Sequence, residues 1–188
     1  MDFITVVSGL PRSGTSMMKT MLQAGGLEIL TDNVREPDDD NPRGYFELEK
    51  VKKVKEDTSW LHSASGKAFK MVSQLLYDLP PDRQYRIIFM KRKMQEILAS
   101  QKKMLENSGK DAGGAGEGKM SLLFQKHLAV IESWVKKQNN IRTLFVNYND
   151  VIANPFQEAQ RINEFLELHL DLAKMVEVVE PALYRQRK

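Results

Sequence analysis

The first 26 residues carry the feature that most constrains the fold, because an apolar strand, a glycine-containing turn and a helix follow one another directly. Residues 3–7 form a β-branched run that predicts a buried strand, and Ser8-Gly9 ends it. Gly25-Gly26 later supplies a helix stop signal. Between these signals, four apolar side chains recur at helical spacing: Met17, Met18, Met21 and Leu22. The chain therefore opens as strand, loop and helix.

The same alternation continues along the rest of the chain. Further strands are predicted at residues 68–72, 86–90 and 143–146. Further helices are predicted at residues 48–61, 94–107, 122–138, 155–168 and 171–179. Two loops are predicted, at residues 31–46 and, rich in glycine, at 108–118. This order favours an α/β fold of three layers, with helices flanking a central, mainly parallel sheet. The length suits one domain over residues 1–188.

Composition excludes several kinds of site. The chain has no cysteine, so disulfides, thiolate metal sites and a cysteine nucleophile are excluded, and its three histidines do not stand at metal-ligand spacing. The net charge of +3 is compatible with an anionic ligand but is too small to indicate a nucleic-acid partner. The sequence contains neither an apolar run long enough to cross a bilayer nor a signal-peptide pattern. We therefore expect a cytoplasmic protein that has no membrane segment.

The strongest local signal lies between the first strand and the first helix, where residues 9–16 read Gly-Leu-Pro-Arg-Ser-Gly-Thr-Ser. Backbone N–H groups of such a loop converge on one point, and the helix N-terminus adds partial positive charge, so together they bind phosphate. The loop is close to the ATP-binding pattern G-x-x-x-x-G-K-[ST], but Thr15 replaces the lysine and Arg12 is the nearest cation. A glycine-rich turn without a ligand is the alternative, which the position, the cation and the hydroxyls together disfavour.

A second departure from the ATP-binding pattern concerns metal. Enzymes that use ATP in such a loop need a carboxylate at the end of a neighbouring strand to hold Mg²⁺. The predicted strand 86–90 is followed by Lys91-Arg92, and the strand 143–146 is followed by Asn147-Tyr148. A donor whose transferred group carries less charge than a phosphoryl group does not need the metal, so we expect no metal site.

These motifs resemble those of the sulfotransferases that use 3′-phosphoadenosine 5′-phosphosulfate (PAPS). The family loop for the 5′-phosphosulfate reads P-[KR]-S-G-T-[ST], and residues 11–16 match it. The family motif for the 3′-phosphate is an arginine after a strand and a serine eight residues later, as in Arg92 and Ser100. A later strand with a tyrosine-containing turn, residues 145–150, and the helical segment 165–168 also match. The resemblance covers nearly the whole chain and implies the P-loop fold.

The resemblance also implies which residues contact PAPS. Arg12 is expected to stabilise the charge that develops during transfer, and Lys70 resembles the lysine that many members place opposite the loop. A basic C-terminal tail that includes Arg185 is expected to close over the 3′-phosphate, with a frayed, solvated terminus as the equal alternative. The full set of expected donor contacts is Arg12, Ser13, Gly14, Thr15, Ser16, Arg92, Ser100 and Arg185.

The general base is not carried over from the family. Cytosolic members use a histidine two residues after the strand lysine, where this chain has Val72. Other members use an acidic residue on the loop after the first helix, and we favour Asp32 or Glu36. Either carboxylate would need partial burial or a neutral neighbour to raise its pKa. The predicted loop 31–46 also contains Asp38, Asp39 and Asp40, and Glu47 lies just beyond it; a solvated acidic loop is the alternative reading for each of these residues. His62 is a second candidate, although its apolar surroundings favour a packed structural histidine, and His127 and His169 read as structural.

The sequence thus predicts a sulfotransferase that moves a sulfuryl group from PAPS to a hydroxyl or amine of a small-molecule or glycan acceptor, by metal-independent in-line transfer. Two alternatives remain open, a P-loop kinase of small molecules and a nucleotide-binding module without turnover. A nucleic-acid-binding protein is disfavoured, because Tyr77, Tyr85 and Tyr148 are scattered rather than interleaved with a basic stripe. The acceptor and the oligomeric state stay open.

Overall fold

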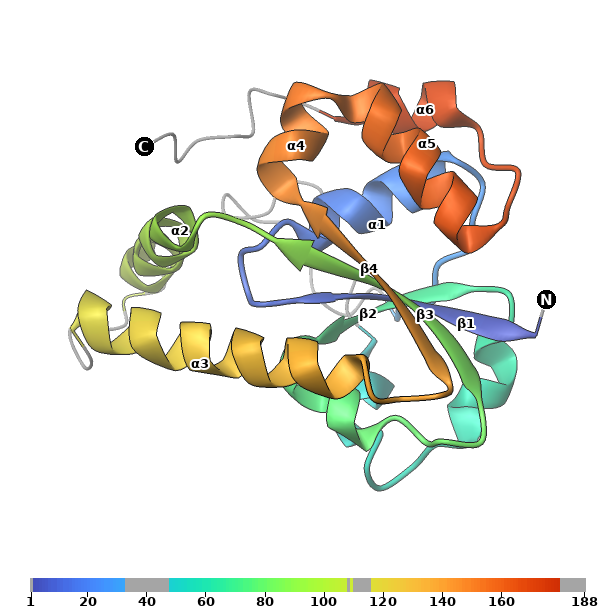
Figure 1. Cartoon of the computed structure of the whole chain (residues 1–188), viewed down its shortest axis with the longest axis horizontal. Helices are drawn as coiled ribbons and strands as arrows, with labels where there is room; N and C mark the ends of the chain where they lie inside the picture. Colours follow the sequence, from blue (N-terminus) through green and yellow to red (C-terminus); the bar gives the residue numbers. More distant parts are fainter. Residues whose placement is uncertain (1, 33–47, 108, 110–115, 180–188) are drawn as a thin grey trace.

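Four parallel strands form the central sheet of the protein (Figure 1). In this computed structural model, residues 2–32, 48–107, 109 and 116–179 are described. The strands lie side by side in the order β2-β1-β3-β4, and neighbouring strands pair in parallel throughout. Their bounds are β1 Phe3–Gly9, β2 Ala68–Val72, β3 Gln84–Lys91 and β4 Ile141–Asn147. The predicted parallel α/β fold is confirmed.

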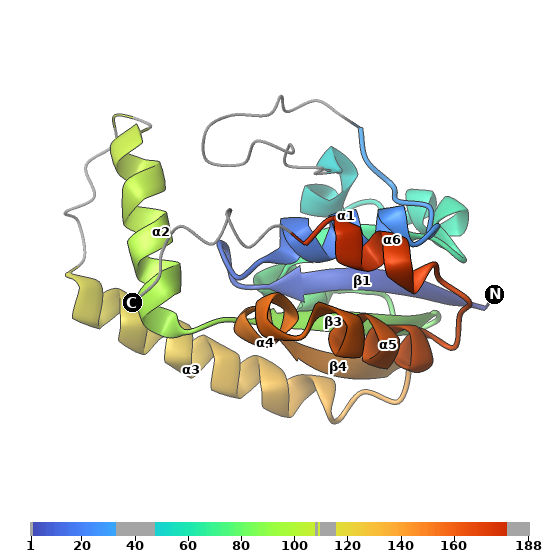
Figure 2. The same cartoon turned by 90° about the horizontal axis from the view of Figure 1, so that it is seen from above.

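Helices cover both faces of this sheet, as Figures 1 and 2 show from two directions. One face packs against the helices α1 (Thr15–Ala24), α4 (Tyr148–Ala153), α5 (Pro155–Leu166) and α6 (Leu172–Glu177). The other face packs against α3 (Glu117–Val135) and the 3₁₀ helices η1 (Glu49–Lys53), η2 (Ser59–Ala64) and η3 (Ser73–Asp78). The remaining helix, α2 (Met94–Asn107), begins three residues after β3 and extends from the carboxyl edge of the sheet (Figure 2).

The two faces of the sheet bury two separate apolar cores, because successive side chains of a strand point to opposite sides. In β3, Ile87 and Phe89 pack with α3 and the 3₁₀ helices, whereas Ile88 and Met90 pack with α1 and α4 to α6. A strand buried on both faces is apolar at nearly every position, which explains why the strands read as short continuous apolar runs. The three-layer architecture is therefore the expected one.

Two predicted elements differ from the structure. Residues 48–61 form η1 and the start of η2 rather than one amphipathic helix. The break falls at Asp57, whose carboxylate accepts the Ser59 N–H at 2.8 Å and whose carbonyl accepts the Trp60 indole N–H at 3.1 Å. Such local bonds compete with helical hydrogen bonds. The tyrosine-containing turn after β4 is the helix α4, which Asn147 caps by accepting the Asn149 N–H at 3.2 Å.

Other boundaries agree closely with expectation. The bounds of β2 and α2 coincide with the predicted segments 68–72 and 94–107. The helix α3 begins at Glu117, inside the predicted glycine-rich loop, and ends at Val135, three residues early. Most of that loop, and most of the predicted loop 31–46, lies outside the described residues.

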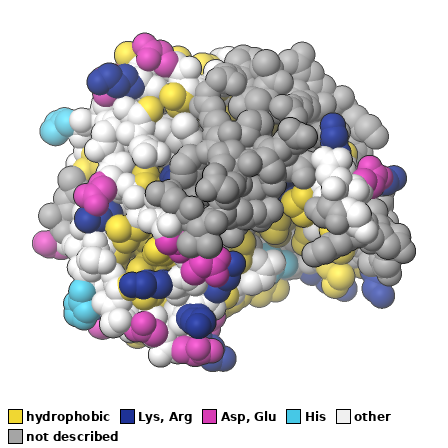
Figure 3. Space-filling view, turned by 180° about the vertical axis from the view of Figure 1, so that it is seen from behind, with side chains coloured by type: hydrophobic (Ala, Val, Ile, Leu, Met, Phe, Trp, Pro, Cys, Tyr) yellow, Lys and Arg dark blue, Asp and Glu magenta, His cyan; other side chains and the backbone are white. Residues whose placement is uncertain are grey.

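The surface of the described part carries charges of both signs. On the face seen in Figure 3, acidic and basic side chains alternate with apolar ones, in keeping with the small net charge of +3. None of the helices within the described segments combines the length and the apolar character that crossing a membrane requires.

Candidate functional site

The turn between β1 and α1 lies at the carboxyl edge of the sheet, and two glycines allow it to close tightly. A Cβ on Gly9 would lie 2.5 Å from Ser13 Oγ and 2.7 Å from the Met90 carbonyl oxygen. Gly14, at φ 101°, caps α1, and a Cβ there would lie 2.4 Å from the Tyr148 ring. Neither position accepts a larger residue without displacement of its neighbours, so the tight conformation of the loop requires glycine at both positions.

The loop presents polar groups at the start of α1. The first N–H groups of a helix have no hydrogen-bond partner within the helix. In α1 the first helical turn is closed by the Met18 N–H, which donates to the Gly14 carbonyl at 3.1 Å. Gly14 has no side chain with which to cap the earlier N–H groups. The Ser13 hydroxyl beside them is fully buried and has no hydrogen-bond partner among the described residues. A bound anion would satisfy such groups.

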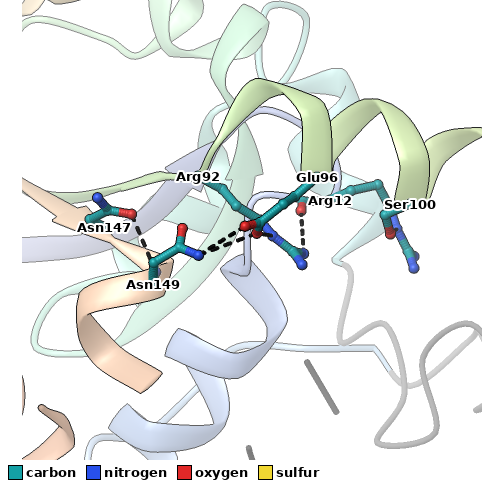
Figure 4. Close-up of polar contacts among 6 residues, drawn as sticks. All are labelled: Arg12, Arg92, Glu96, Ser100, Asn147 and Asn149. Atoms are coloured by element: carbon teal, nitrogen blue, oxygen red, sulfur yellow. Dashed lines mark hydrogen bonds and ion pairs between the residues drawn. The ribbon is translucent and has the colours of Figure 1, made fainter. Parts of the chain in front are cut away.

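Arg12 links this loop to Arg92, which directly follows β3, and to Ser100 in α2. The Arg12 Nε–H donates to Ser100 Oγ at 2.8 Å, and Arg92 Nη1 donates to the Arg12 carbonyl oxygen at 3.2 Å (Figure 4). Arg12 itself adopts a left-handed backbone conformation at φ 67°, which this hydrogen bond to its carbonyl helps to hold. The structure thus brings together three predicted site residues that are 80 and 88 residues apart in the sequence.

Arg92 is in turn held by residues that the motifs do not include. Its Nε–H donates to a buried carboxylate oxygen of Glu96 at 2.8 Å, and its guanidinium lies 4.3 Å from the centre of the Tyr148 ring. Asn149 Nδ2 donates to the same carboxylate at 3.0 Å, so α4 also contributes (Figure 4). The spacing of Arg92 and Glu96, four residues apart at the start of a predicted helix, is the sequence signal that points to their pairing.

Two lysines lie between α1 and β2. Lys70 is aligned with Val7 of β1 and, by alternation with Phe69 and Met71, lies on the face of the sheet that α1 covers. Lys19 of α1 is fully buried. Burial, and then the charge of Lys70, lowers the pKa of the Lys19 amine to about 7. The motifs do not point to Lys19, and its only sequence signal is a charged residue within the apolar stripe of a helix.

The predicted acidic bases fall mostly outside the described residues. This applies to Glu36, Asp38, Asp39, Asp40 and Glu47, and also to the tail residue Arg185. Asp32 is exposed, and its Oδ2 accepts the backbone N–H of Glu49 at 2.5 Å, so it caps the start of η1.

The histidines lie away from the loop or pack against other elements. His62 contacts Arg83 Nη2 at 3.2 Å, and Arg83 directly precedes β3, so this pair lies at the amino edge of the sheet. That edge is opposite the loop, so the alternative in which His62 acts as the base is not supported. His127 of α3 shares a hydrogen bond of 2.8 Å with Ser73 Oγ, and burial lowers its pKa. His169 is exposed.

No group of three or more histidine, aspartate or glutamate side chains that could hold a metal ion occurs in the ranges 2–32, 48–107 and 116–179. In these ranges the loop between β1 and α1 lies with Arg12 and Arg92, and Lys19 and Lys70 come from the adjoining α1 and β2. Chemically, such an arrangement can hold an anion and stabilise negative charge on a leaving group.

Known proteins share this architecture. The model of the sulfotransferase domain family matches residues 4–188. The mouse sulfotransferase SULT7A1, solved in complex with PAP, superposes with a TM-score of 0.60 at 18% identity, over 100% of this chain and 66% of that one. Sulfotransferase STF1 from Mycobacterium tuberculosis H37Rv gives a TM-score of 0.58 at 14% identity, over 97% of this chain and 72% of that one.

A sulfotransferase domain from the curacin biosynthetic pathway gives a TM-score of 0.58 at 13% identity, over 96% of this chain and 78% of that one. The chain therefore spans between 66% and 78% of the length of these three proteins. At such identities the likeness concerns the fold alone. No protein in a curated set of sequences matches the chain.

Proposed function

Because this chain belongs to the sulfotransferase domain family, we propose that it transfers a sulfuryl group from PAPS to a hydroxyl or amine of a small-molecule or glycan acceptor. The observation that carries the proposal is the contact of Arg12 with both Arg92 and Ser100. It joins the loop that suits a 5′-phosphosulfate to the pair that suits a 3′-phosphate. PAPS carries charge at both of these positions, whereas ATP carries it only at the 5′ position.

The residues of the site fit this donor. The buried Ser13 hydroxyl and the first N–H groups of α1 would hold the 5′ end, with Gly14, Thr15 and Ser16 at the helix start. Ser100 Oγ accepts a hydrogen bond from Arg12, which leaves its own hydrogen to donate to a 3′-phosphate oxygen. That the mouse sulfotransferase of similar fold was solved with PAP supports the choice of nucleotide.

In the proposed reaction the acceptor oxygen or nitrogen attacks sulfur in line with the bond to the 5′-phosphate oxygen. Arg12 stabilises the negative charge that develops on that leaving oxygen, and Lys70 does so from the opposite side. Arg92 positions Arg12 through the carbonyl hydrogen bond, and Glu96 orients Arg92. No step in this scheme requires a metal ion.

A base removes the acceptor proton, and Asp32 and Glu36 remain our candidates. The Asp32 carboxylate is oriented by the hydrogen bond that it accepts from the Glu49 N–H. Glu36 follows four residues later in the sequence. Replacement of each carboxylate by its amide, with transfer rates measured against pH, would identify the base by loss of the acidic limb of the profile.

We also propose that residues 1–188 form one domain, since both apolar cores pack against the same sheet. The tail residue Arg185 remains a proposed contact of the 3′-phosphate. A cytoplasmic location without a nucleic-acid partner remains our expectation from composition.

Calorimetric titration of the chain with PAP, the desulfated product of PAPS, and separately with Mg·ATP tests which nucleotide the protein binds. We expect PAP to bind without metal and Mg·ATP to bind weakly or not at all, because Thr15 replaces the lysine that holds ATP phosphates. Preference for Mg·ATP would establish the kinase alternative instead.

A radiolabelled-sulfate assay with phenols, sugars and amines tests turnover. Transfer from PAPS to any of them supports the enzyme. Tight PAP binding together with no transfer across the panel would favour the module without turnover.

A further inference from the structure

A fully buried lysine in the helix that follows the loop has no part in the scheme above. Lys19 lies in α1 beside the buried apolar residues Met18, Met21 and Leu22. A buried ammonium is costly, and a methionine or leucine at this position would pack without that cost. Such a residue suggests a role beyond packing.

The location of Lys19 connects it with the anion-binding loop. It lies one helical turn after Thr15, on the same side of α1, and side chains of a helix lean towards its N-terminus. We therefore expect its four-carbon stem to extend towards the start of α1. Lys70, on the α1 face of β2, is close enough for its charge to act on the Lys19 amine. The two lysines thus come from α1 and β2, which adjoin the loop, and their amines interact electrostatically.

Within the described residues, the elements packed against α1 contribute the following charges. β1 contains no charged residue, and β2 contributes Lys70. The charged residues around α6 lie at the other end of α1, where the Asp171 N–H donates to the Gly25 carbonyl at 3.0 Å. They are Asp171, Lys174 and Glu177. The charge of Lys70 therefore adds to burial in lowering the pKa of Lys19.

We propose that Lys19 takes up a proton from solvent when the donor binds, so that Lys19 and Lys70 together hold its 5′ anionic end. The inference rests on the proposed function. A bound anion turns the repulsion between the two amines into attraction for both, which raises the pKa of Lys19.

The direction of the pH dependence follows. In the free protein the pKa of Lys19 is about 7, so at pH 8 most of the amine is neutral. Binding at pH 8 should then take up nearly one proton, and well below pH 7 it should take up none. PAP affinity should therefore fall as the pH rises from 7 towards 9. The phosphates of PAP are already fully ionised there, so they contribute little.

Calorimetric titration with PAP at pH 8, in two buffers of different ionisation enthalpy, measures the uptake directly. The wild type should take up a substantial fraction of a proton. Lys19→Met, which suits the methionine-rich surroundings, should abolish the uptake and weaken PAP binding by about tenfold or more. Lys19→Arg, which carries a permanent charge, should also show no uptake.

Lys70→Met is the matched control, because it leaves Lys19 in place but removes the repelling charge. Its uptake at pH 8 should be smaller than that of the wild type, since Lys19 is then partly protonated before binding. Thermal unfolding of each variant verifies that it is folded.

Two outcomes separate the inference from the function on which it rests. PAP binding without proton uptake by the wild type, or with equal uptake by Lys19→Met, overturns the inference and leaves the proposed function intact. Absence of PAP binding by the wild type overturns both.

Discussion

Single residues in the site differ in how strongly their surroundings constrain them. Arg12 is held through its side chain by Ser100 and through its carbonyl by Arg92, although it lies in a partly exposed loop. Arg92 is held in turn by the buried Glu96. Substitution of Arg12 should therefore lower the rate of sulfuryl transfer, and substitution of Glu96 should lower the free energy of unfolding.

Arg12→Ala should reduce the turnover of PAPS by at least about tenfold to a hundredfold, because a donor of charge-assisted hydrogen bonds to the leaving oxygen is lost. The rate of radiolabelled sulfate transfer measures this. Arg12→Lys is the control, since the family motif also accepts lysine, and it should retain more activity. Transfer by Arg12→Ala at the wild-type rate would refute the role assigned to this guanidinium.

Glu96→Ala should destabilise the protein by about 3–5 kcal/mol, because the partner of a buried ion pair is left uncompensated. Urea unfolding measures the change. Lys52→Ala, which breaks an exposed ion pair with Glu49, is the control and should cause little change. An equal effect of the two substitutions would contradict the buried character of the Arg92–Glu96 pair.

At the scale of elements, the loop, α2 and α4 depend on one another. The ring of Tyr148, the first residue of α4, packs against Gly14 and against the Arg92 guanidinium. Asn149 of the same helix reaches Glu96 of α2. The loop between β1 and α1 is therefore supported by a helix from a distant part of the sequence.

Gly14→Ala tests this support. It should destabilise the protein and weaken PAP binding, because its Cβ would lie 2.4 Å from the Tyr148 ring. Gly26→Ala is a matched control, since Gly26 has a similar φ of 99° but no heavy atom within 4 Å of the added Cβ. It should cost only the backbone strain of about 1 kcal/mol, with PAP affinity unchanged. Equal effects in urea unfolding would show that the ring contact does not matter.

At the scale of the whole molecule, buried titratable groups set the pH dependence of stability. Lys19 binds its proton less tightly in the folded than in the unfolded state, since its pKa is lowered to about 7 by burial and by Lys70. The unfolded chain therefore binds more protons between about pH 7 and pH 10, and the free energy of unfolding should rise over that window. Burial raises the pKa of Tyr85 and of Tyr148, which should reverse the trend above about pH 10.

The difference between the wild type and Lys19→Met isolates this contribution. Urea unfolding at pH 7, 8 and 9 should show wild-type stability rising with pH by at most about 1.4 kcal/mol per unit, and a flatter profile for the variant. The variant should also be more stable at pH 7, because no ammonium is buried there. Parallel profiles of the two proteins would contradict the lowered pKa.

The sequence by itself determined the order of the strands and the place of the glycine-containing loop between β1 and α1. Buried parallel strands read as apolar runs, and the loop motif needs glycine at fixed places, so both leave local signals that survive without the fold. The spacing of Arg92 and Ser100, an arginine just before α2 and a serine within it, is a local signal in the same sense.

Only the tertiary structure brought Arg12 to Ser100, Tyr148 to Gly14 and Lys70 to Lys19. These interactions join strands and helices far apart in the chain, and no periodicity of the sequence encodes them. The state of Lys19 has the same origin, because its pKa depends on burial and on a charge from another strand. The break between η1 and η2 at Asp57 was not predicted either. The apolar residues there have helical spacing, but the hydrogen bonds of Asp57 compete with those of a continuous helix.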